Sequence, residues 1–435
     1  MSWLGGLWQR FQRSQYWKDV TWLVSGNVVA HFITLATMPV LSRLYAPSDF
    51  ALLSLFTTGV GFVSLVTMRY EYMVPLPSED ADGWRICQLV LRIGILATLL
   101  LTPIAWLFRQ WIAAWVENRA LAPWLLLMPC TAVLIPVGVA AQGWAQRQGR
   151  YDQSGTAEAV EKGLRNASSV ALRMAVTGPS GLILGSVAGL AGKVAYVFRR
   201  DLRRLLAPTG GLRRVLRAYR RLCISLSVGQ LLLAGTSAIP VVFMAKRFGA
   251  DTLGQFAVAN AMIALPSVLL GTAVGNVYYQ RAAASWNRGS SLVGLWKSTA
   301  RRLVLVGVPA YLALMVALPA FVPLILGQRW HEAGAFASVL SVGALFSFAT
   351  TPMDRTCLVV GAWWYQPVWH TSRLVTTGLV AWISLAMALS GAGFVRLLVV
   401  QQSVLYLVDY WSQWRFSRST APSPGGAPDG SLCER

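Results

Sequence analysis

Four polar side chains near the start of this sequence have types and spacings that suit a binding site in apolar surroundings. Asn27 and His31 lie within a long apolar stretch, four residues apart, so on a helix they share one face. Arg69 and Glu71 follow the next apolar stretch and are close enough in sequence to pair. An Arg, Lys or Asp at the centre of a membrane helix costs about 2.5–3.5 kcal/mol. Such groups are therefore expected to face a cavity or a partner.

The second half of the sequence offers counterparts to these residues. Gln230, Asn260 and Asn276 are amides in or just after two later apolar stretches, where their side chains can hydrogen-bond a polar ligand. Arg281 follows the second of these stretches, as Arg69 follows the second stretch of the first half. The candidate site is therefore predicted to draw on both halves of the chain.

Structural readings of the same residues stay open at this point. Arg69 could equally be an arginine at the membrane interface, with Glu71 as a solvated carboxylate. A single histidine such as His31 often only hydrogen-bonds a neighbouring helix. The residues alone do not choose between these readings and a binding role.

The elements that must position these side chains are about twelve membrane-spanning helices. A helix needs about 20 mostly apolar residues to cross the hydrocarbon of a bilayer. The expected spans are 20–41, 50–68, 86–108, 121–142, 153–176, 180–198, 222–245, 255–274, 303–325, 333–352, 367–389 and 391–412. No gap between them is large enough for a separate soluble domain. We therefore predict an all-α polytopic membrane protein.

The composition agrees with this class. The chain has 435 residues, of which 55% are hydrophobic and 13% charged, whereas soluble domains carry about 25% charged residues. The net charge of +21 would also suit a nucleic-acid-binding protein, but its distribution argues otherwise. With the N-terminus in the cytoplasm, inner segments hold 25 of the 38 Lys and Arg residues and outer loops hold 6. This asymmetry is the positive-inside rule, so both ends are expected to be cytoplasmic.

Four regions are expected along the chain. Residues 1–198 form a six-helix bundle preceded by an amphipathic interfacial segment, and 199–221 form a basic cytoplasmic linker. Residues 222–412 form a second six-helix bundle, and 413–435 form a disordered cytoplasmic tail. The linker has nine arginines and one aspartate, which favours contact with anionic lipid headgroups.

A short internal similarity links the two bundles. Residues 42–56 and 245–260 both run from a base through an aromatic residue and a small-residue turn into an apolar span. Arg43 and Lys246 take equivalent places in these segments, as do Tyr45 and Phe248. Weak internal symmetry of this kind is typical of secondary transporters.

Several chemistries are disfavoured by what the sequence lacks. Its five cysteines are scattered without metal-ligand spacing, and it has no phosphate-binding glycine motif or Ser/His/Asp arrangement. We therefore predict no metal site, cofactor or ATP hydrolysis. A membrane polymerase or ligase is disfavoured too, because the longest outward loop, 109–120, is about a dozen residues long.

The expected span 153–176 is the most polar. Its charged residues allow two pairs at i,i+4 spacing, Glu158 with Lys162 and Glu161 with Arg165. These pairs would let the segment lie in the membrane without free charge.

Several segments resemble the bacterial polysaccharide flippases, a family of the multidrug/oligosaccharidyl-lipid/polysaccharide (MOP) superfamily. The most specific match is the Arg-Tyr-Glu of residues 69–71 within TMRYEYMVPLPSEDADGW (67–84), after LSRLYAPSDFALLSLF (41–56). Further matches cover residues 144–166, 181–190 and 357–374. The chain departs from the family pattern at Ala51, where glycine is usual, and at Trp363–Trp364, where a basic residue is common.

This resemblance implies a fold and a function. Members have two pseudo-symmetric six-helix bundles around a central cavity and move polyprenyl-diphosphate-linked oligosaccharide repeat units from the cytoplasmic to the periplasmic leaflet by alternating access. They serve O-antigen or exopolysaccharide synthesis in the bacterial inner membrane, in an anionic bilayer and beside polysaccharide polymerases and glycosyltransferases. In this sequence the residues that would bind the diphosphate are Arg69, Arg281 and His31. Those that would hydrogen-bond the sugar are Asn27, Gln230, Asn260 and Asn276. Glu71 would act in coupling or gating.

The alternative is a cation-coupled multidrug exporter of the same superfamily. It would need an acidic pocket for cationic drugs. Apart from Glu158 and Glu161, acids within the spans are scarce, and Asp354 and Asp409 lie near span ends. The basic balance favours an anionic substrate.

Overall fold

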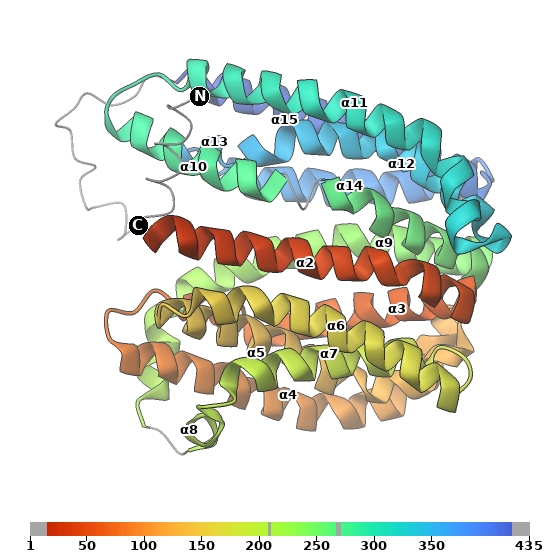
Figure 1. Cartoon of the computed structure of the whole chain (residues 1–435), viewed down its shortest axis with the longest axis horizontal. Helices are drawn as coiled ribbons and strands as arrows, with labels where there is room; N and C mark the ends of the chain where they lie inside the picture. The colour runs from red at the N-terminus through yellow and green to blue at the C-terminus, as the bar shows by residue number, and fades with distance from the viewer. Residues whose placement is uncertain (1–14, 208–209, 267–270, 420–435) are drawn as a thin grey trace, which may run out of the picture. The chain divides into compact units, whose positions relative to one another are not determined.

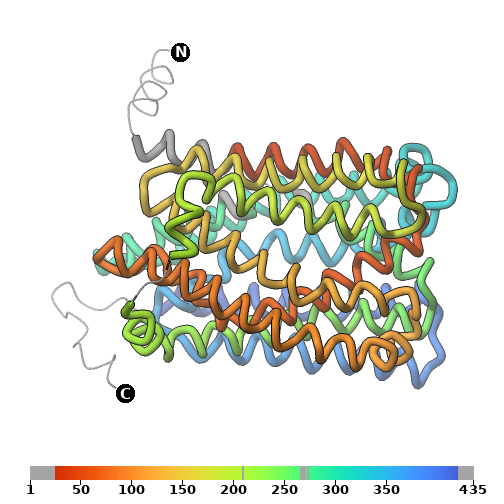
Figure 2. The backbone as a smooth tube through the Cα atoms, turned by 90° about the horizontal axis from the view of Figure 1, so that it is seen from below, coloured from red at the N-terminus to blue at the C-terminus, as the bar shows by residue number. Residues whose placement is uncertain are grey.

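The computed structural model describes residues 15–207, 210–266 and 271–419, and no strand occurs among them. The expected N-terminal interfacial segment lies mostly outside these residues. Contacts divide the chain into two compact units. Unit 1 comprises Met1–Val258 and Val322–Glu332, and unit 2 comprises Ala259–Phe321 and Ala333–Arg435. Within each unit the helices run along nearly one common direction (Figures 1 and 2). The predicted all-α polytopic membrane fold is confirmed.

Unit 1 is built from the first half of the chain (Figure 1). Its helices are α2 (Gln15–Leu44), α3 (Pro47–Val63), α4 (Asp80–Trp115), α5 (Met128–Arg147), α6 (Tyr151–Ala175), α7 (Ser180–Phe198) and α8 (Leu202–Leu206). Three 3-10 helices join them, η1 (Ser64–Thr67), η2 (Tyr70–Met73) and η3 (Arg119–Leu126). The first part of α9 (Leu212–Pro266) also belongs to unit 1.

Unit 2 contains the second half. Its helices are α10 (Thr272–Asn287), α11 (Val293–Leu326), α12 (His331–Thr350), α13 (Thr356–Val359), α14 (Tyr365–Ala386) and α15 (Gly391–Ser417). The 3-10 helices η5 (Gln328–Trp330) and η6 (Thr351–Met353) precede and follow α12. The last turn of α11, η5 and the first two residues of α12 belong to unit 1.

Nine helices of the described part are long and apolar enough to cross a membrane. The difference from twelve has two causes. The expected spans 222–245 and 255–274 lie largely in two successive helical segments of α9, which count as one helix although the non-helical Gly249, whose φ of 85° favours glycine, separates them. The expected spans at α6 and α14 do form helices, of 25 and 22 residues, but they carry too many polar residues to meet the same standard.

Small residues let α2, α6 and α7 pack with their backbones in contact. Gly26 of α2 lies against Gly155 of α6, where an added Cβ would come within 2.0 Å of the Gly155 carbonyl oxygen. On the other side of α6, Gly189 of α7 faces the backbone of Glu161. Close approach through small residues is the usual way membrane helices associate, because lipid offers no hydrophobic drive between them.

The two carboxylates of α6 share a cation from α7, and neither i,i+4 pair predicted for α6 is among the ion pairs of the described residues. Lys193 of α7 is buried and donates to both Glu158 and Glu161, at 3.1 Å for the Oε2 of Glu161. Lys162 contacts the other oxygen of Glu161 at 2.8 Å. A buried cation between helices satisfies both carboxylates at once, which neighbours on the same helix surface do not achieve.

The basic segment 199–221 is anchored to unit 1. Leu205 and Val215 are buried in the core cluster that also contains Trp84 and Trp144, while the nine arginines of the segment are exposed. At the other end of the chain, α15 continues through the buried Gln413 to Ser417, beyond the start of the expected tail. Residues 420–435 lie outside the described residues. The division into two six-helix bundles, a linker and a tail stays a prediction.

A leucine at Gly26 should disrupt the packing of α2 on α6. Gly26→Leu inserts a side chain where even a Cβ overlaps the Gly155 backbone, so we expect the free energy of unfolding to fall by about 1–3 kcal/mol or more. The apparent melting temperature of the purified protein in detergent measures this. Gly163→Ala is the matched control, because no atom lies within 4 Å of a Cβ there. Equal melting of both variants would contradict the packing.

Candidate functional site

The predicted pair Arg69 and Glu71 lies where the chain leaves α3 through two tight turns. Met68 and Arg69 both adopt left-handed backbone conformations, with φ of 49° and 61°. Consecutive residues other than glycine in this region are strained and cluster at functional sites. The turn places Glu71 back over Thr67, whose hydroxyl donates to Glu71 Oε2 at 2.9 Å. Arg69 donates to Glu71 Oε1 at 3.3 Å.

Glu71 is buried, with 1% of its surface exposed, so the solvated reading of this carboxylate is wrong. Burial raises the pKa of Glu71, and the hydrogen bonds and the Arg69 charge oppose this shift only in part. The Arg69 guanidinium also lies 4.7 Å from the centre of the Tyr72 ring. Arg69 is therefore held between a carboxylate and an aromatic face, with 13% of its side chain exposed.

Arg147 fixes the loop that follows this motif, and sequence reasoning missed it. From the end of α5 its guanidinium donates to the carbonyl oxygens of Pro75, Pro77 and Ser78, and its Nε contacts Asp80 at 2.7 Å. One side chain therefore satisfies several acceptors of the loop between η2 and α4. The available signal was that both segments, 67–84 and 144–166, carried the family resemblance.

Loss of the Arg147 guanidinium should loosen this loop. Arg147→Met leaves the carbonyls of Pro75, Pro77 and Ser78 without their donor, so we expect amide hydrogen exchange at Leu76, whose N–H donates to the Met73 carbonyl, to rise roughly ten- to a hundredfold. Mass spectrometry of the exchanged protein measures it. Arg150→Met is the control, because Arg150 pairs with Asp201 instead. Unchanged exchange in Arg147→Met would show that other contacts hold the loop.

The raised pKa of Glu71 predicts how its protonation and the stability of the protein depend on pH. Its proton should persist to higher pH than that of a free glutamic acid, so the protonated carboxyl band in the infrared spectrum should titrate above the ordinary range. The folded state then binds more protons than the unfolded state, and this contribution to stability is lost as pH rises through the folded-state pKa. Glu71→Gln should remove the Glu71 contribution to this band, seen in the difference between the two spectra, together with its share of the pH dependence. A band that titrates at the ordinary value would refute the assignment.

Asn27 and His31 lie on one face of α2, as their spacing predicts. His31 Nδ1 lies 2.8 Å from the backbone oxygen of Asn27, and the Asn27 side chain is exposed on the same helix. Gln230 is half-buried in the first part of α9. These three residues belong to unit 1, together with Arg69 and Glu71. Their roles in binding stay predictions.

Unit 2 contains a polar pocket of about 370 Å³ that includes Asn276. Helix α10 supplies Gly275 and Asn276, and Gly271 directly precedes it, while α12 and the turns after it supply hydroxyl, carboxylate and guanidinium groups. The lining residues are Gly271, Gly275, Asn276, Ser347, Phe348, Thr351, Pro352, Asp354 and Arg355. This set can donate and accept hydrogen bonds on several sides, as a ligand rich in hydroxyl groups requires.

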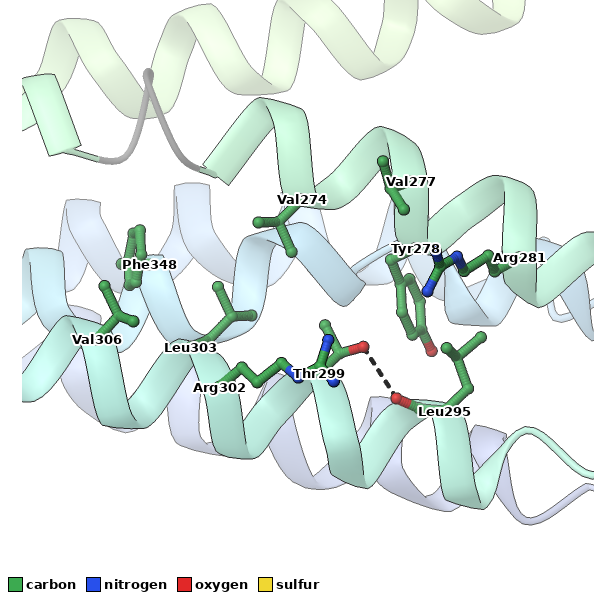
Figure 3. Close-up of a pocket in the computed structure, with 10 residues that line it drawn as sticks. All are labelled: Val274, Val277, Tyr278, Arg281, Leu295, Thr299, Arg302, Leu303, Val306 and Phe348. Carbon is green, nitrogen blue, oxygen red and sulfur yellow. Dashed lines mark hydrogen bonds between the residues drawn. The ribbon is translucent and has the colours of Figure 1, made fainter. Parts of the chain in front are cut away.

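Arg281 lines a second pocket of about 440 Å³ between α10 and α11. Figure 3 shows Arg281 on α10 and Arg302 on the facing helix α11, with apolar side chains along the rest of the pocket. The lining residues are Val274, Val277, Tyr278, Arg281, Leu295, Thr299, Arg302, Leu303, Val306 and Phe348. They include two cations and no carboxylate. Phe348 borders both pockets.

The structure therefore brings some predicted residues together within each unit. Arg69 and Glu71 are in contact, and Asn276 and Arg281 line neighbouring pockets. Asn260 is exposed on α9 and lines neither pocket. Sequence reasoning missed Arg302, although a base directly before an apolar stretch was a visible signal.

Comparison with known proteins identifies the class. The chain is similar in structure to an inward-facing multidrug resistance MATE family transporter of the MOP superfamily, with a TM-score of 0.66, 15% identity, and 89% of this chain and 94% of that chain covered. The lipid II flippase MurJ in an inward closed conformation gives a TM-score of 0.65 at 11% identity, covering 92% and 90%. A MOP superfamily transporter from Pyrococcus furiosus gives 0.56 at 14%, covering 94% and 97%. The chain has the fold of these MOP superfamily proteins and is a multi-pass membrane protein.

The family is given by the sequence. A family model described as "polysaccharide biosynthesis protein" matches residues 40–335. The chain belongs to this family, and the resemblance to polysaccharide flippases is confirmed. None of the curated proteins compared with the chain matched its sequence significantly.

Proposed function

We propose that this protein is a flippase for polyprenyl-diphosphate-linked oligosaccharide repeat units and moves them from the cytoplasmic to the periplasmic leaflet of the bacterial inner membrane. The observation that carries the proposal is the charge of the α10–α11 pocket. Arg281 and Arg302 line it without an acidic residue, and neither has an ion pair with any carboxylate in the described part of the chain. Two unneutralised guanidinium groups favour a diphosphate.

The remaining site residues suit the rest of such a substrate. The polar pocket around Asn276 offers amide and hydroxyl groups for a sugar, close to the cationic pocket. In unit 1, Arg69 would bind the diphosphate with His31, while Asn27 and Gln230 would hydrogen-bond the glycan. Asn260 belongs to the same proposed set. Glu71 would act in coupling or gating, because a proton on this carboxylate releases Arg69 from its ion pair.

The membrane potential can help to drive export of an anionic substrate. Moving one net negative charge outward from a cell with a negative interior gains about 2.3 kcal/mol per 100 mV. A diphosphate-linked substrate would therefore be drawn outward during an alternating-access cycle. Polysaccharide polymerases and glycosyltransferases are the partners this activity implies.

The rival function, export of cationic drugs, requires an acidic pocket. The acids of span α6 are not available for this, because Lys193 pairs with both Glu158 and Glu161. The polar pocket of unit 2 contains Asp354 but also Arg355. The charges of the polar pocket balance, while the α10–α11 pocket has two bases and no acid, which favours an anionic substrate.

Reconstitution tests the proposal. Proteoliposomes containing the protein should move labelled polyprenyl-diphosphate-linked oligosaccharide between leaflets, and Arg69→Gln and Arg281→Gln should each slow this at least about tenfold, because each removes a charge-assisted contact. Arg69→Lys keeps the charge and should retain part of the activity. Arg301→Gln is the control, because Arg301 is exposed and lines neither pocket.

Flipping at the wild-type rate in both Arg69→Gln and Arg281→Gln would remove these two arginines from the mechanism. The proposed function itself would be refuted if wild-type proteoliposomes transported a cationic dye but not the lipid-linked sugar, which would establish the multidrug alternative.

A further inference from the structure

The pocket between α10 and α11 changes from polar to apolar along its length. Figure 3 shows Arg281, Arg302 and Thr299 toward one end, and Val306 and Phe348 at the other. The two helices are antiparallel, because the chain reverses at residues 288–292 between them. The end of α10 therefore lies beside the beginning of α11, which brings Arg281 and Arg302 to the same end of the pocket.

The arginines stand where the apolar stretches of their helices end. Arg302 directly precedes the apolar residues of α11, and Arg281 follows Val274 and Val277 on α10. In a bilayer this places both guanidinium groups toward the headgroup region and the apolar part of the pocket toward hydrocarbon. A phosphorylated lipid matches this arrangement, because its phosphate lies at the headgroup region and its apolar chain extends into the hydrocarbon.

Two hydroxyl groups at this end of the pocket are already hydrogen-bonded within the protein, which leaves the arginines for a ligand. The Thr299 hydroxyl donates to the Leu295 carbonyl at 2.9 Å, and the Tyr278 hydroxyl is hydrogen-bonded to Thr356. The two arginines remain as the cationic groups that face the pocket. Their chemistry selects phosphate oxygens, which guanidinium groups bind through paired hydrogen bonds.

We propose that this pocket is the dock for the lipid part of the substrate, with Arg281 and Arg302 on the phosphate and the side chains of Val274, Val306 and Phe348 along the first prenyl units. This rests on the proposed function and deepens it, because it adds a place for the prenyl chain to the pocket that the proposed function assigns to the diphosphate. The volume of about 440 Å³ is that of a small-molecule site, roughly 300–1,000 Å³. Val277 and Val306 remain 42% and 52% exposed, so a longer chain can continue into the bilayer.

Phe348 separates the α10–α11 pocket from the polar pocket. It lies at the apolar end of the α10–α11 pocket and also borders the polar pocket around Asn276. The two pockets occupy neighbouring faces of α10. A substrate held in the dock would therefore have the polar pocket within reach for its sugar, with an aromatic ring between sugar and chain.

Binding of farnesyl diphosphate tests the dock, because this probe carries both a diphosphate and a short prenyl chain. We expect the full-length protein in phosphatidylcholine nanodiscs to bind it at least about tenfold more tightly than farnesol or inorganic diphosphate, measured by calorimetry. Arg302→Gln should weaken binding at least about tenfold, and Arg302→Lys should retain part of it. Val306→Trp should reduce farnesyl diphosphate to the affinity of diphosphate alone.

The chain offers matched controls beside both positions. Arg301→Gln and Leu305→Trp alter exposed neighbours on α11 that do not line the pocket, so both should bind farnesyl diphosphate as the wild type does. Wild-type affinity in Arg302→Gln and Val306→Trp would overturn the proposal. Equal competition by phosphatidylglycerol added to the nanodiscs would overturn it too, because the pocket would then be a general site for anionic phospholipid.

The flipping assay separates this inference from the proposed function. If Arg302→Gln loses farnesyl diphosphate binding but flips lipid-linked oligosaccharide at the wild-type rate, the dock is refuted and the flippase stands. If the wild type binds farnesyl diphosphate at this pocket but flips no lipid-linked sugar, the proposed function fails and the lipid-diphosphate site stands.

Discussion

The cost of leaving charge unpaired in hydrocarbon governs where the ionic groups of this protein lie. In unit 1 the buried charges neutralise one another. Lys193 sits between Glu158 and Glu161, and Arg69 contacts Glu71. In unit 2, Arg281 and Arg302 line a pocket without an acid and remain partly exposed. Both arginines are exposed and lie toward the headgroup region, so they need no acidic partner within the protein and are open to an anionic ligand.

The motif that carried the family resemblance has a physical explanation in the structure. Two left-handed residues, Met68 and Arg69, turn the chain so that Glu71 is buried against Thr67. Arg147 then holds the following loop by its carbonyl oxygens. Strain in this turn is maintained because neighbouring groups are fixed around it. A gating role for Glu71 would use a feature that the turn creates, a buried carboxylate in contact with the Arg69 guanidinium.

Some residues were predictable and others were not, for identifiable reasons. Asn27 and His31 share a helix face because their spacing fixes it on any α-helix. The partner of Glu158 and Glu161 was not predictable, because Lys193 lies on another helix and its approach depends on the close packing of Gly189 against α6. Arg302 was visible as a base before an apolar stretch, but its place opposite Arg281 required the antiparallel pairing of α10 and α11.

The sequence by itself determined the all-helical membrane class, the position of most spans, and the family. The length of each apolar stretch and the local motifs contain that information, because whether a segment can cross a bilayer as a helix depends on the residues of that segment alone. Only the tertiary structure decided which charges are paired and which face a pocket. Those outcomes depend on contacts between helices far apart in the chain, and such contacts follow from packing geometry that no single segment specifies.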